Sequence, residues 1–358
     1  MKILIEVMHG LGDEVCALPM IENICLAYPD ADITVLVNSE GGKEIIEHGN
    51  FKASKTIILN VHKDKKFKVV RECRDMRRNK YDMGISCALT SMTKAHLFMG
   101  AIAPEIKAGI QFSRKQDFQA LNDRMHFVDA NLEILKDLNI SLTVTSPRLI
   151  ANPLLVTYFR SVMDTGNQKK RIGVCIGNAD ATYKYKYIRK KPVYAKGWGI
   201  SNMTLLCERL LDNEYSLFLI GGKQEIPLFK QMPEKIKSRS VSFVGKTTVA
   251  ESMAVASLCD VLVGVDTGMQ HIADALGVKT VSIFGPTNPH TRGAYSKNAR
   301  FVECEKECKY CFGTARYTRC EDRKCLKEIT VEHVFKIITE ILKGEAKAKD
   351  GIEETDHE

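Results

Sequence analysis

Apolar and polar residues alternate along the first half of the chain in a pattern typical of repeated strand–helix units. Four short apolar runs predict strands, at residues 2–8, 33–37, 56–61 and 83–87. Elsewhere apolar residues recur every three or four positions, which predicts helices at 13–28 and 131–138. Strands that alternate with helices pair in parallel, so this half predicts a parallel sheet with helices on its faces.

The alternation restarts at residue 171 and is more regular there. Strands are expected at 172–176, 217–220, 261–265 and 280–284, and helices at 202–211, 249–257, 267–276 and 331–342. We therefore expect an α/β protein in which two Rossmann-like domains face each other across a cleft and bind ligands at the carboxyl ends of their strands. The expected boundaries are 1–155, 156–328, a C-terminal helix at 329–343 and a charged, disordered tail at 344–358.

Composition and charge narrow the class of protein. A chain of 358 residues exceeds one ordinary core, and its 44% hydrophobic and 27% charged residues are typical of globular proteins. The net charge of +8 is modest, so an anionic small ligand or acidic acceptor fits and nucleic acid is not required. Because neither a signal peptide nor a membrane-spanning run is visible, we expect a cytoplasmic protein, with peripheral contact at the inner membrane compatible.

The first candidate site follows the first strand, where the chain reads Gly10-Leu11-Gly12-Asp13. Glycines at such a place let the backbone approach a ligand closely, and the Asp13 carboxylate could deprotonate an attacking sugar hydroxyl. The alternative is a carboxylate that caps its own helix, and the segment alone favours this alternative. The third glycine of a dinucleotide fingerprint is missing, which disfavours an NAD-dependent oxidoreductase.

The second candidate site follows the strand at 261–265. Thr267 can cap the next helix, Gly268 allows close approach, and the free N–H groups of the first turn predict a phosphate-binding site. Asp266 is expected to hold a ribose or sugar hydroxyl. His271 lies one turn further and either donates to a phosphate or is a buried structural histidine.

A basic stretch precedes the helix at 202–211. We assign one functional residue in it, Lys196, whose ammonium would neutralise a departing pyrophosphate. The remaining basic residues are interpreted as solvated or acceptor-facing: Lys184, Lys186, Arg189, Lys190 and Lys191. A second basic stretch, at 63–80, suggests an anionic acceptor but is better interpreted as a solvated face.

Five of the 12 cysteines crowd into residues 304–325, while the other seven are scattered and typical of reduced core thiols. The spacing of the crowded set predicts a structural zinc or iron site, since thiolates select these metals. The expected ligands are Cys308, Cys311, Cys320 and Cys325, which leaves Cys304 spare. The alternatives are reduced thiols or disulfides.

Several short motifs occur together along the chain. They are Gly10-Leu11-Gly12-Asp13 with Leu18-Pro19, Lys196-Gly197-Trp198, Gly221-Gly222 with Glu225, Val265-Asp266-Thr267-Gly268 with His271-Ile272-Ala273, Ala275-Leu276-Gly277, and Phe284-Gly285-Pro286-Thr287. In this order they resemble glycosyltransferase family 9, the ADP-heptose:lipopolysaccharide heptosyltransferases, and the likeness spans nearly the whole chain.

The resemblance implies a GT-B fold and an inverting transfer of a sugar, a heptose from ADP-heptose, to a hydroxyl of a glycan, lipid-linked or protein acceptor. Asp13 would be the general base and Lys196 the phosphate-binding lysine. Some members carry a similar cysteine pattern that holds iron. The donor-binding residues implied are Gly12, Glu225, Lys246, Asp266, Thr267, Gly268 and His271.

No catalytic metal is expected if Lys196 and the helix start at Thr267 stabilise the departing diphosphate. The triplet Asp30-Ala31-Asp32, which resembles a metal-binding motif, is interpreted as a turn. Two alternatives stay open: a sugar-nucleotide epimerase of the same fold, and a non-catalytic protein that binds sugar nucleotides or metal. The sequence leaves the acceptor, the nucleotide base and the oligomeric state undecided.

Overall fold

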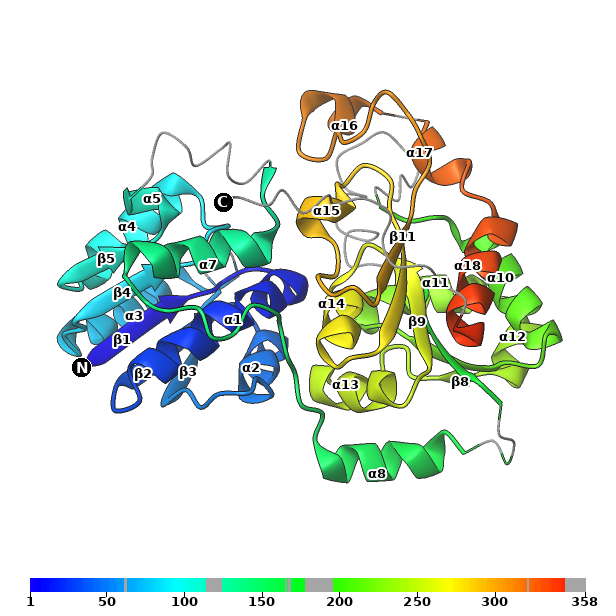
Figure 1. Cartoon of the computed structure of the whole chain (residues 1–358), viewed down its shortest axis with the longest axis horizontal. Coiled ribbons are helices and arrows are strands. Elements are labelled where there is room, and N and C mark those ends of the chain that lie inside the picture. The colour runs from blue at the N-terminus through cyan, green and yellow to red at the C-terminus, as the bar shows by residue number, and fades with distance from the viewer. Residues whose placement is uncertain are drawn as a thin grey trace, which may run out of the picture. The chain divides into compact units, whose positions relative to one another are not determined.

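The computed structural model describes residues 1–60, 63–113, 124–164, 166, 169–177, 196–320 and 322–344 (Figure 1). The chain separates into two compact units. The first contains Met1–Leu155 together with Thr248–Met253 and His290–Arg292, and the second contains the rest. The expected tail beyond residue 344 lies outside the described residues.

The first unit contains a five-stranded parallel sheet in the order β3-β2-β1-β4-β5. Its strands are β1 (Lys2–Glu6), β2 (Asp32–Val37), β3 (Lys55–Ile58), β4 (Met83–Ser86) and β5 (Ile106–Ala108). Strand order reverses between β1 and β4, and such a switch point is where ligands bind in open α/β sheets. The expected Asp30-Ala31-Asp32 turn is confirmed, since it leads directly into β2.

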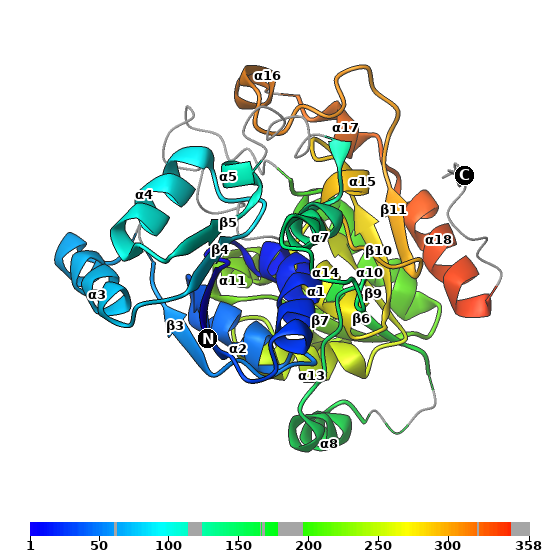
Figure 2. The ribbon, with the colours of Figure 1, turned by 60° about the vertical axis from the view of Figure 1, so that its left-hand side comes forward.

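Helices cover both faces of this sheet. They are α1 (Leu11–Ala27), α2 (Glu40–Glu47), α3 (Lys66–Arg78), α4 (Met92–Ile102), α5 (Ile110–Ser113) and α7 (Phe127–Asp137). In Figure 2, α3 and α4 lie on one face and α1 and α7 on the other. Because the central strand is enclosed on both faces, consecutive residues such as Ile3, Leu4 and Ile5 are all fully buried.

The second unit contains a six-stranded parallel sheet in the order β11-β10-β9-β6-β7-β8, with a switch point between β9 and β6. Its strands are β6 (Arg171–Cys175), β7 (Ser216–Ile220), β8 (Val241–Ser242), β9 (Val261–Val265), β10 (Lys279–Ile283) and β11 (Ala299–Val302). Two parallel sheets with helical connections confirm the predicted α/β class with two Rossmann-like domains.

After α7, the described residues form ten further helices and one 3-10 turn, η2 (Lys223–Glu225). Most of these elements lie in the second unit, but residues Thr248–Met253 and His290–Arg292 belong to the first. The helices are α8 (Pro153–Val162), α10 (Ile200–Asp212), α11 (Ile226–Gln231), α12 (Glu234–Arg239), α13 (Val249–Ser257), α14 (Gly268–Ala275), α15 (Pro289–Arg292), α16 (Ala315–Arg319), α17 (Lys324–Lys327) and α18 (Val331–Lys343). Within the ranges that the structure describes, no helix has the length and apolar character needed to cross a bilayer.

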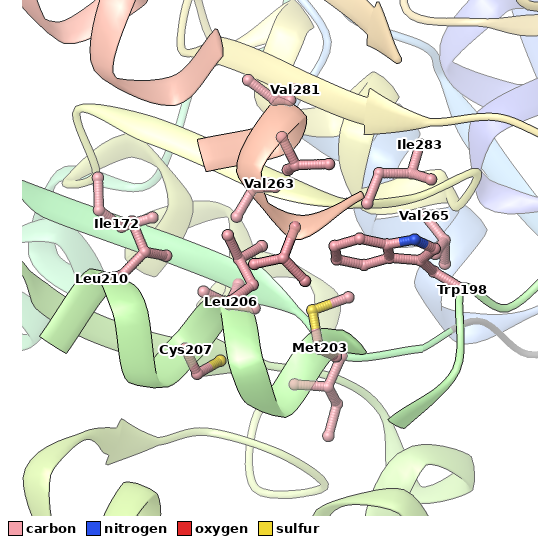
Figure 3. Packing of buried hydrophobic residues seen from close by; sticks show 14 of the residues in the cluster. Ile172, Trp198, Met203, Leu206, Cys207, Leu210, Val263, Val265, Val281 and Ile283 are labelled. Atoms are coloured by element: carbon pink, nitrogen blue, oxygen red, sulfur yellow. The ribbon is translucent and has the colours of Figure 1, made fainter. Parts of the chain in front are cut away.

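The core of the second unit surrounds the single tryptophan. Figure 3 shows the Trp198 indole beside Met203 of α10 and beside Val265 and Ile283 at the ends of β9 and β10. The indole is 4% exposed, and its Nε1 donates a hydrogen bond to the Ile329 carbonyl at 2.9 Å. The segment that carries Lys196 is therefore tied to the sheet and to the start of α18.

Candidate functional site

In the second unit, the candidate residues gather where parallel strands end. Asp266 follows β9, and Gly285 to Thr287 follow β10, the neighbouring strand. The carboxyl ends of parallel strands share one edge of the sheet, and β9 borders the switch point. The structure thus brings both predicted loops of this unit to one place.

Thr267 occupies the N-cap position of α14 with an extended backbone, but its side chain makes no capping hydrogen bond. The expectation that Thr267 caps the helix through its hydroxyl is therefore wrong. The backbone N–H of Gln270 donates a hydrogen bond to the Thr267 carbonyl at 3.0 Å. The helix begins at Gly268, and the first N–H groups of a helix have no carbonyl partners within it, so this end attracts anions.

Lys196 lies directly beside this helix start. Its Nζ is 2.7 Å from Oδ2 of Asp266, and the two side chains are only 15% and 11% exposed. The Lys196 ammonium also lies 4.2 Å from the ring centroid of Phe312. Two residues that the sequence assigned to phosphate and to a sugar hydroxyl thus form one shielded ion pair, 70 positions apart in the chain.

Buried polar groups that sequence reasoning missed lie in the same region. Gln270 is 2% exposed and Thr287 is 1% exposed, and among the described residues neither the Gln270 amide nor the Thr287 hydroxyl has a hydrogen-bond partner. A Cβ on Gly264 would lie 3.1 Å from Gln270 Nε2, so the glycine leaves room for the amide. A buried polar group without a partner costs about 1–3 kcal/mol, which favours a polar ligand.

Glu225 lies at the same edge, after β7. Its Oε2 accepts a hydrogen bond from the Gly222 amide at 2.8 Å, and burial raises the pKa of this carboxyl. A Cβ on Gly177, after β6, would lie 3.3 Å from Glu225 Cγ, which places the side chain beside the switch point. Glu225 is therefore positioned near the predicted donor site, although one of its oxygens already shapes its own turn.

Lys246 and His271, two further predicted donor-binding residues, lie at more accessible positions. The Lys246 side chain is exposed, and its Nζ donates to the Ser242 carbonyl at 2.9 Å, within the turn that follows β8. His271 lies in the first turn of α14 and is half-buried. The basic residues between Lys184 and Lys191 lie outside the described residues. The stretch at 63–80 forms α3, where most basic side chains are exposed, as expected for a solvated face.

In the first unit, Asp13 lies in the first turn of α1, after β1. Its Oδ2 accepts a hydrogen bond from the Gly10 amide at 3.2 Å, so the capping interpretation is confirmed for this oxygen. Gly10 has φ −79° and Gly12 is helical, so neither glycine uses the left-handed region. A Cβ on Gly10 would lie 3.4 Å from Asp13 Oδ2, an ordinary contact, so the carboxylate lies close to the glycine backbone.

A buried polar network lies next to Asp13 and was missed from the sequence. The His9 imidazole Nε2 is 2.8 Å from Thr90 Oγ1, and that hydroxyl donates to Glu6 Oε2 at 2.7 Å. Burial alone would lower the pKa of His9, but Cys87, Glu6 and Asp13 outweigh burial and raise it to about 10. A His9 imidazole with this pKa keeps its proton at neutral pH, which places a positive charge in the same region as Asp13.

Glu14 follows Asp13 and behaves differently. It is fully buried, and in the part of the chain that the structure describes neither carboxyl oxygen has a hydrogen-bond partner. Burial and the neighbouring Asp13 raise its pKa to about 8. A Cβ on Gly42 would clash with this carboxyl, so the glycine makes the space that Glu14 fills. The Glu14 carboxyl therefore keeps its proton at neutral pH.

None of the twelve cysteines forms a disulfide bond in this structure. Burial, then Cys308 and Cys320, raise the pKa of Cys311, and burial, then Cys308 and Cys311, raise that of Cys325 to about 11. The four predicted ligands therefore lie within electrostatic range of one another. Within the described ranges, however, no group of three or more His, Cys, Asp or Glu side chains is arranged as a metal site. Cys304 pairs instead with Glu328.

Comparison with known proteins gives a consistent result. Residues 69–320 match glycosyltransferase family 9 (heptosyltransferase). Lipooligosaccharide heptosyltransferase 2 of Campylobacter jejuni is 23% identical over 351 residues, covering 96% of this chain and 99% of that protein. A family 9 glycosyltransferase from Veillonella parvula (19% identity) covers 96% of this chain and 97% of its own with a TM-score of 0.75. The structure of the Escherichia coli ADP-heptose lipopolysaccharide heptosyltransferase II (18% identity) covers 97% of this chain and 100% of its own, with a TM-score of 0.71.

Proposed function

Because the chain belongs to glycosyltransferase family 9, a family of GT-B enzymes, we propose that it transfers a heptose from ADP-heptose to a lipooligosaccharide acceptor. The observation that carries the donor assignment is the buried Lys196–Asp266 pair at the start of α14. The relative from C. jejuni supports the acceptor class, since it is a lipooligosaccharide heptosyltransferase similar over almost its full length. A lipid-linked acceptor would bring the enzyme to the inner membrane surface.

The donor diphosphate would bind at the α14 start, where Lys196 and the first amides, including that of Gly268, offer positive charge. Asp266, while paired with Lys196, would accept a hydrogen bond from a hydroxyl of the ribose or the heptose. The buried side chains of Gln270 and Thr287 would gain hydrogen-bond partners on the same ligand. Glu225, Lys246 and His271 would contact the rest of the donor. Lys196 then compensates the charge that develops as the diphosphate leaves.

Asp13 would act as the general base. The acceptor hydroxyl loses its proton to the carboxylate while its oxygen bonds to the anomeric carbon of the donor. The bond from that carbon to the diphosphate oxygen breaks on the opposite face, so the configuration inverts. The Gly10 hydrogen bond orients the Asp13 carboxyl group for this step. Gly12 would leave space for the reacting sugars.

We further propose that Cys308, Cys311, Cys320 and Cys325 hold a structural zinc or iron ion. Their spacing and mutual proximity support this assignment, and the thiolate set suits either metal. The four side chains would have to rearrange to bind one ion, because among the described residues they are not arranged as a metal site. The metal would stabilise the loop at residues 304–325. We propose no catalytic metal, so this ion would take no part in the transfer.

A panel of nucleotide diphosphates and nucleotide sugars tests the proposal. A ligand at 100 times its dissociation constant stabilises the native state by about 2.7 kcal/mol, so ADP and ADP-heptose should raise the melting temperature while UDP-sugars should not. Transfer to a purified lipooligosaccharide core acceptor, followed by mass spectrometry, identifies the product. Stabilisation by UDP-sugars alone, or no heptose added to any acceptor, would rule out the proposed reaction.

A further inference from the structure

The Lys196 ammonium lies between two side chains from different segments of the protein. Asp266, at the end of β9, contacts it at 2.7 Å, and the ring of Phe312 lies 4.2 Å away. Phe312 belongs to the segment at residues 304–325, here called the cysteine-rich loop, and follows the lysine by 116 positions. A lysine side chain has four rotatable bonds, so an ion pair with one carboxylate still leaves the ammonium several possible positions. The aromatic ring restricts the ammonium from a second direction.

Phe312 is itself held in place through its backbone and through its ring. The Phe312 amide donates to the carbonyl of Pro286 at 2.9 Å, which ties the loop to the turn after β10. The ring packs edge-on against Tyr317, with centroids 5.1 Å apart, and Tyr317 is 2% exposed. Thr314 closes this turn, since its hydroxyl donates to the Cys311 carbonyl at 2.7 Å and accepts from the Tyr317 amide. The cysteine-rich loop thus determines where the ring lies.

An aromatic ring holds a cation in a way that suits a phosphate-binding lysine. The negative face of the ring attracts the ammonium without accepting a full hydrogen bond, so the N–H donors stay available for phosphate oxygens. A second carboxylate at this place would hold the lysine equally well but would reverse the local charge and repel the donor. The ring also excludes water from one side, which strengthens electrostatic attraction.

From these contacts we propose that Phe312 is a positioning residue for Lys196, and that the cysteine-rich loop is thereby part of the donor site. This inference rests on the proposed function, because it assumes that Lys196 binds the donor diphosphate. The consequence is a link between two parts of the protein that the sequence presents as separate. Any change that displaces the Cys311–Tyr317 turn moves the ring and weakens donor binding.

The test compares Phe312→Leu with Phe312→Tyr. Loss of the ring should raise the dissociation constant of ADP, measured by calorimetry, about fivefold or more, while the tyrosine variant should stay within about twofold of the parent. The KM for the donor should rise with the ADP constant, whereas kcat should change less. Phe335→Leu is the matched control, because it removes a ring 4.8 Å from Arg209 in the same unit and should leave ADP affinity unchanged.

A spectroscopic readout separates positioning from general loss of structure. Ring currents of Phe312 should shift the Lys196 Hε resonances upfield, and the shift should disappear in Phe312→Leu and persist in Phe312→Tyr. If Phe312→Leu does not fold, Phe312→Met fills the same volume without a ring and takes its place. Unchanged ADP affinity in a folded ring-less variant overturns the inference while Lys196→Met still weakens ADP binding. Unchanged affinity in Lys196→Met overturns the donor assignment itself.

Discussion

The indole Nε1 of Trp198 donates a hydrogen bond to the Ile329 carbonyl oxygen at 2.9 Å, across 131 positions of the chain. This bond joins the segment that carries Lys196 to the residue just before α18. Trp198→Phe would keep an aromatic ring but leave a buried carbonyl without its donor. We expect a loss of about 1–3 kcal/mol in the free energy of unfolding, measured by urea denaturation. A loss below about 0.5 kcal/mol would mean that the bond contributes little.

Lys196→Met should impair both donor binding and turnover. The substitution removes the ammonium that offsets the negative charge of the shielded Asp266 carboxylate beside the proposed diphosphate site. We expect kcat to fall about 100-fold and the dissociation constant of ADP to rise about tenfold, measured by steady-state kinetics and calorimetry. Lys237→Met serves as the control, because Lys237 lies over the Phe229 ring at 5.7 Å and has no proposed role.

Asp13→Asn distinguishes catalysis from capping. The asparagine Oδ1 can still accept the Gly10 hydrogen bond, so stability should change by less than about 0.5 kcal/mol. Without a base, kcat should fall about 100- to 10,000-fold while ADP affinity stays constant. Thermal unfolding and steady-state kinetics on the same preparation give both numbers. Full turnover in this variant would leave Asp13 with the capping role alone.

Glu14 should make stability depend on pH. Its folded-state pKa of about 8 lies above the ordinary value of 4.5, so the folded protein keeps a proton that the unfolded chain loses. The stabilising contribution is complete below pH 4.5 and is lost as pH rises through 8. Glu14→Gln lacks this dependence, so the free energy of unfolding of the variant should gain about 3–5 kcal/mol relative to the parent between pH 5 and pH 9. A constant difference across that range would contradict a raised pKa.

The metal proposal predicts a difference within the cysteine-rich loop. Cys311→Ser and Cys325→Ser should lose the bound zinc or iron, whereas Cys304→Ser should retain it, because Cys304 pairs with Glu328. Elemental analysis of the purified proteins, with thiols kept reduced, gives the metal per chain. Equal metal content in all three variants, or none in the parent, would exclude this ligand set.

Strands and helices with strong apolar patterns could be predicted from the sequence, and short or polar elements could not. The segment formed by β9, α14 and β10 was predicted to within a residue or two. Strand β9 is continuously apolar and fully buried, and β10 alternates polar with apolar residues before it ends at a glycine and a proline. By contrast β8 has two residues and β5 three, too few to show any period. Helix α3 was interpreted only as a basic stretch, since its apolar residues are too sparse to mark a buried face.

The site residues show the same division. Local signals identified Asp13 and Lys196, which follow recognisable glycine-rich or basic segments. The contacts between distant residues could not be predicted, since they depend on which strands are neighbours in the sheet. His9 meets Thr90 only because β1 pairs with β4, and Lys196 meets Phe312 only because the loop after β11 returns to β10. Gln270 gave no signal, because an amide in a helix is usually solvated.

Strand β8, with two residues, forms the edge of its sheet and leads into the turn that carries Lys246. An edge position has only one neighbouring strand, so insertions or replacements in the following turn disturb few hydrogen bonds. A turn at this edge that contacts the nucleotide base would allow base preference to change while the proposed diphosphate-binding groups, Lys196 and the start of α14, stay constant. Homologues with different nucleotide donors should therefore differ most in the turn after β8. Exchanging this turn between them offers a route to altered donor selectivity.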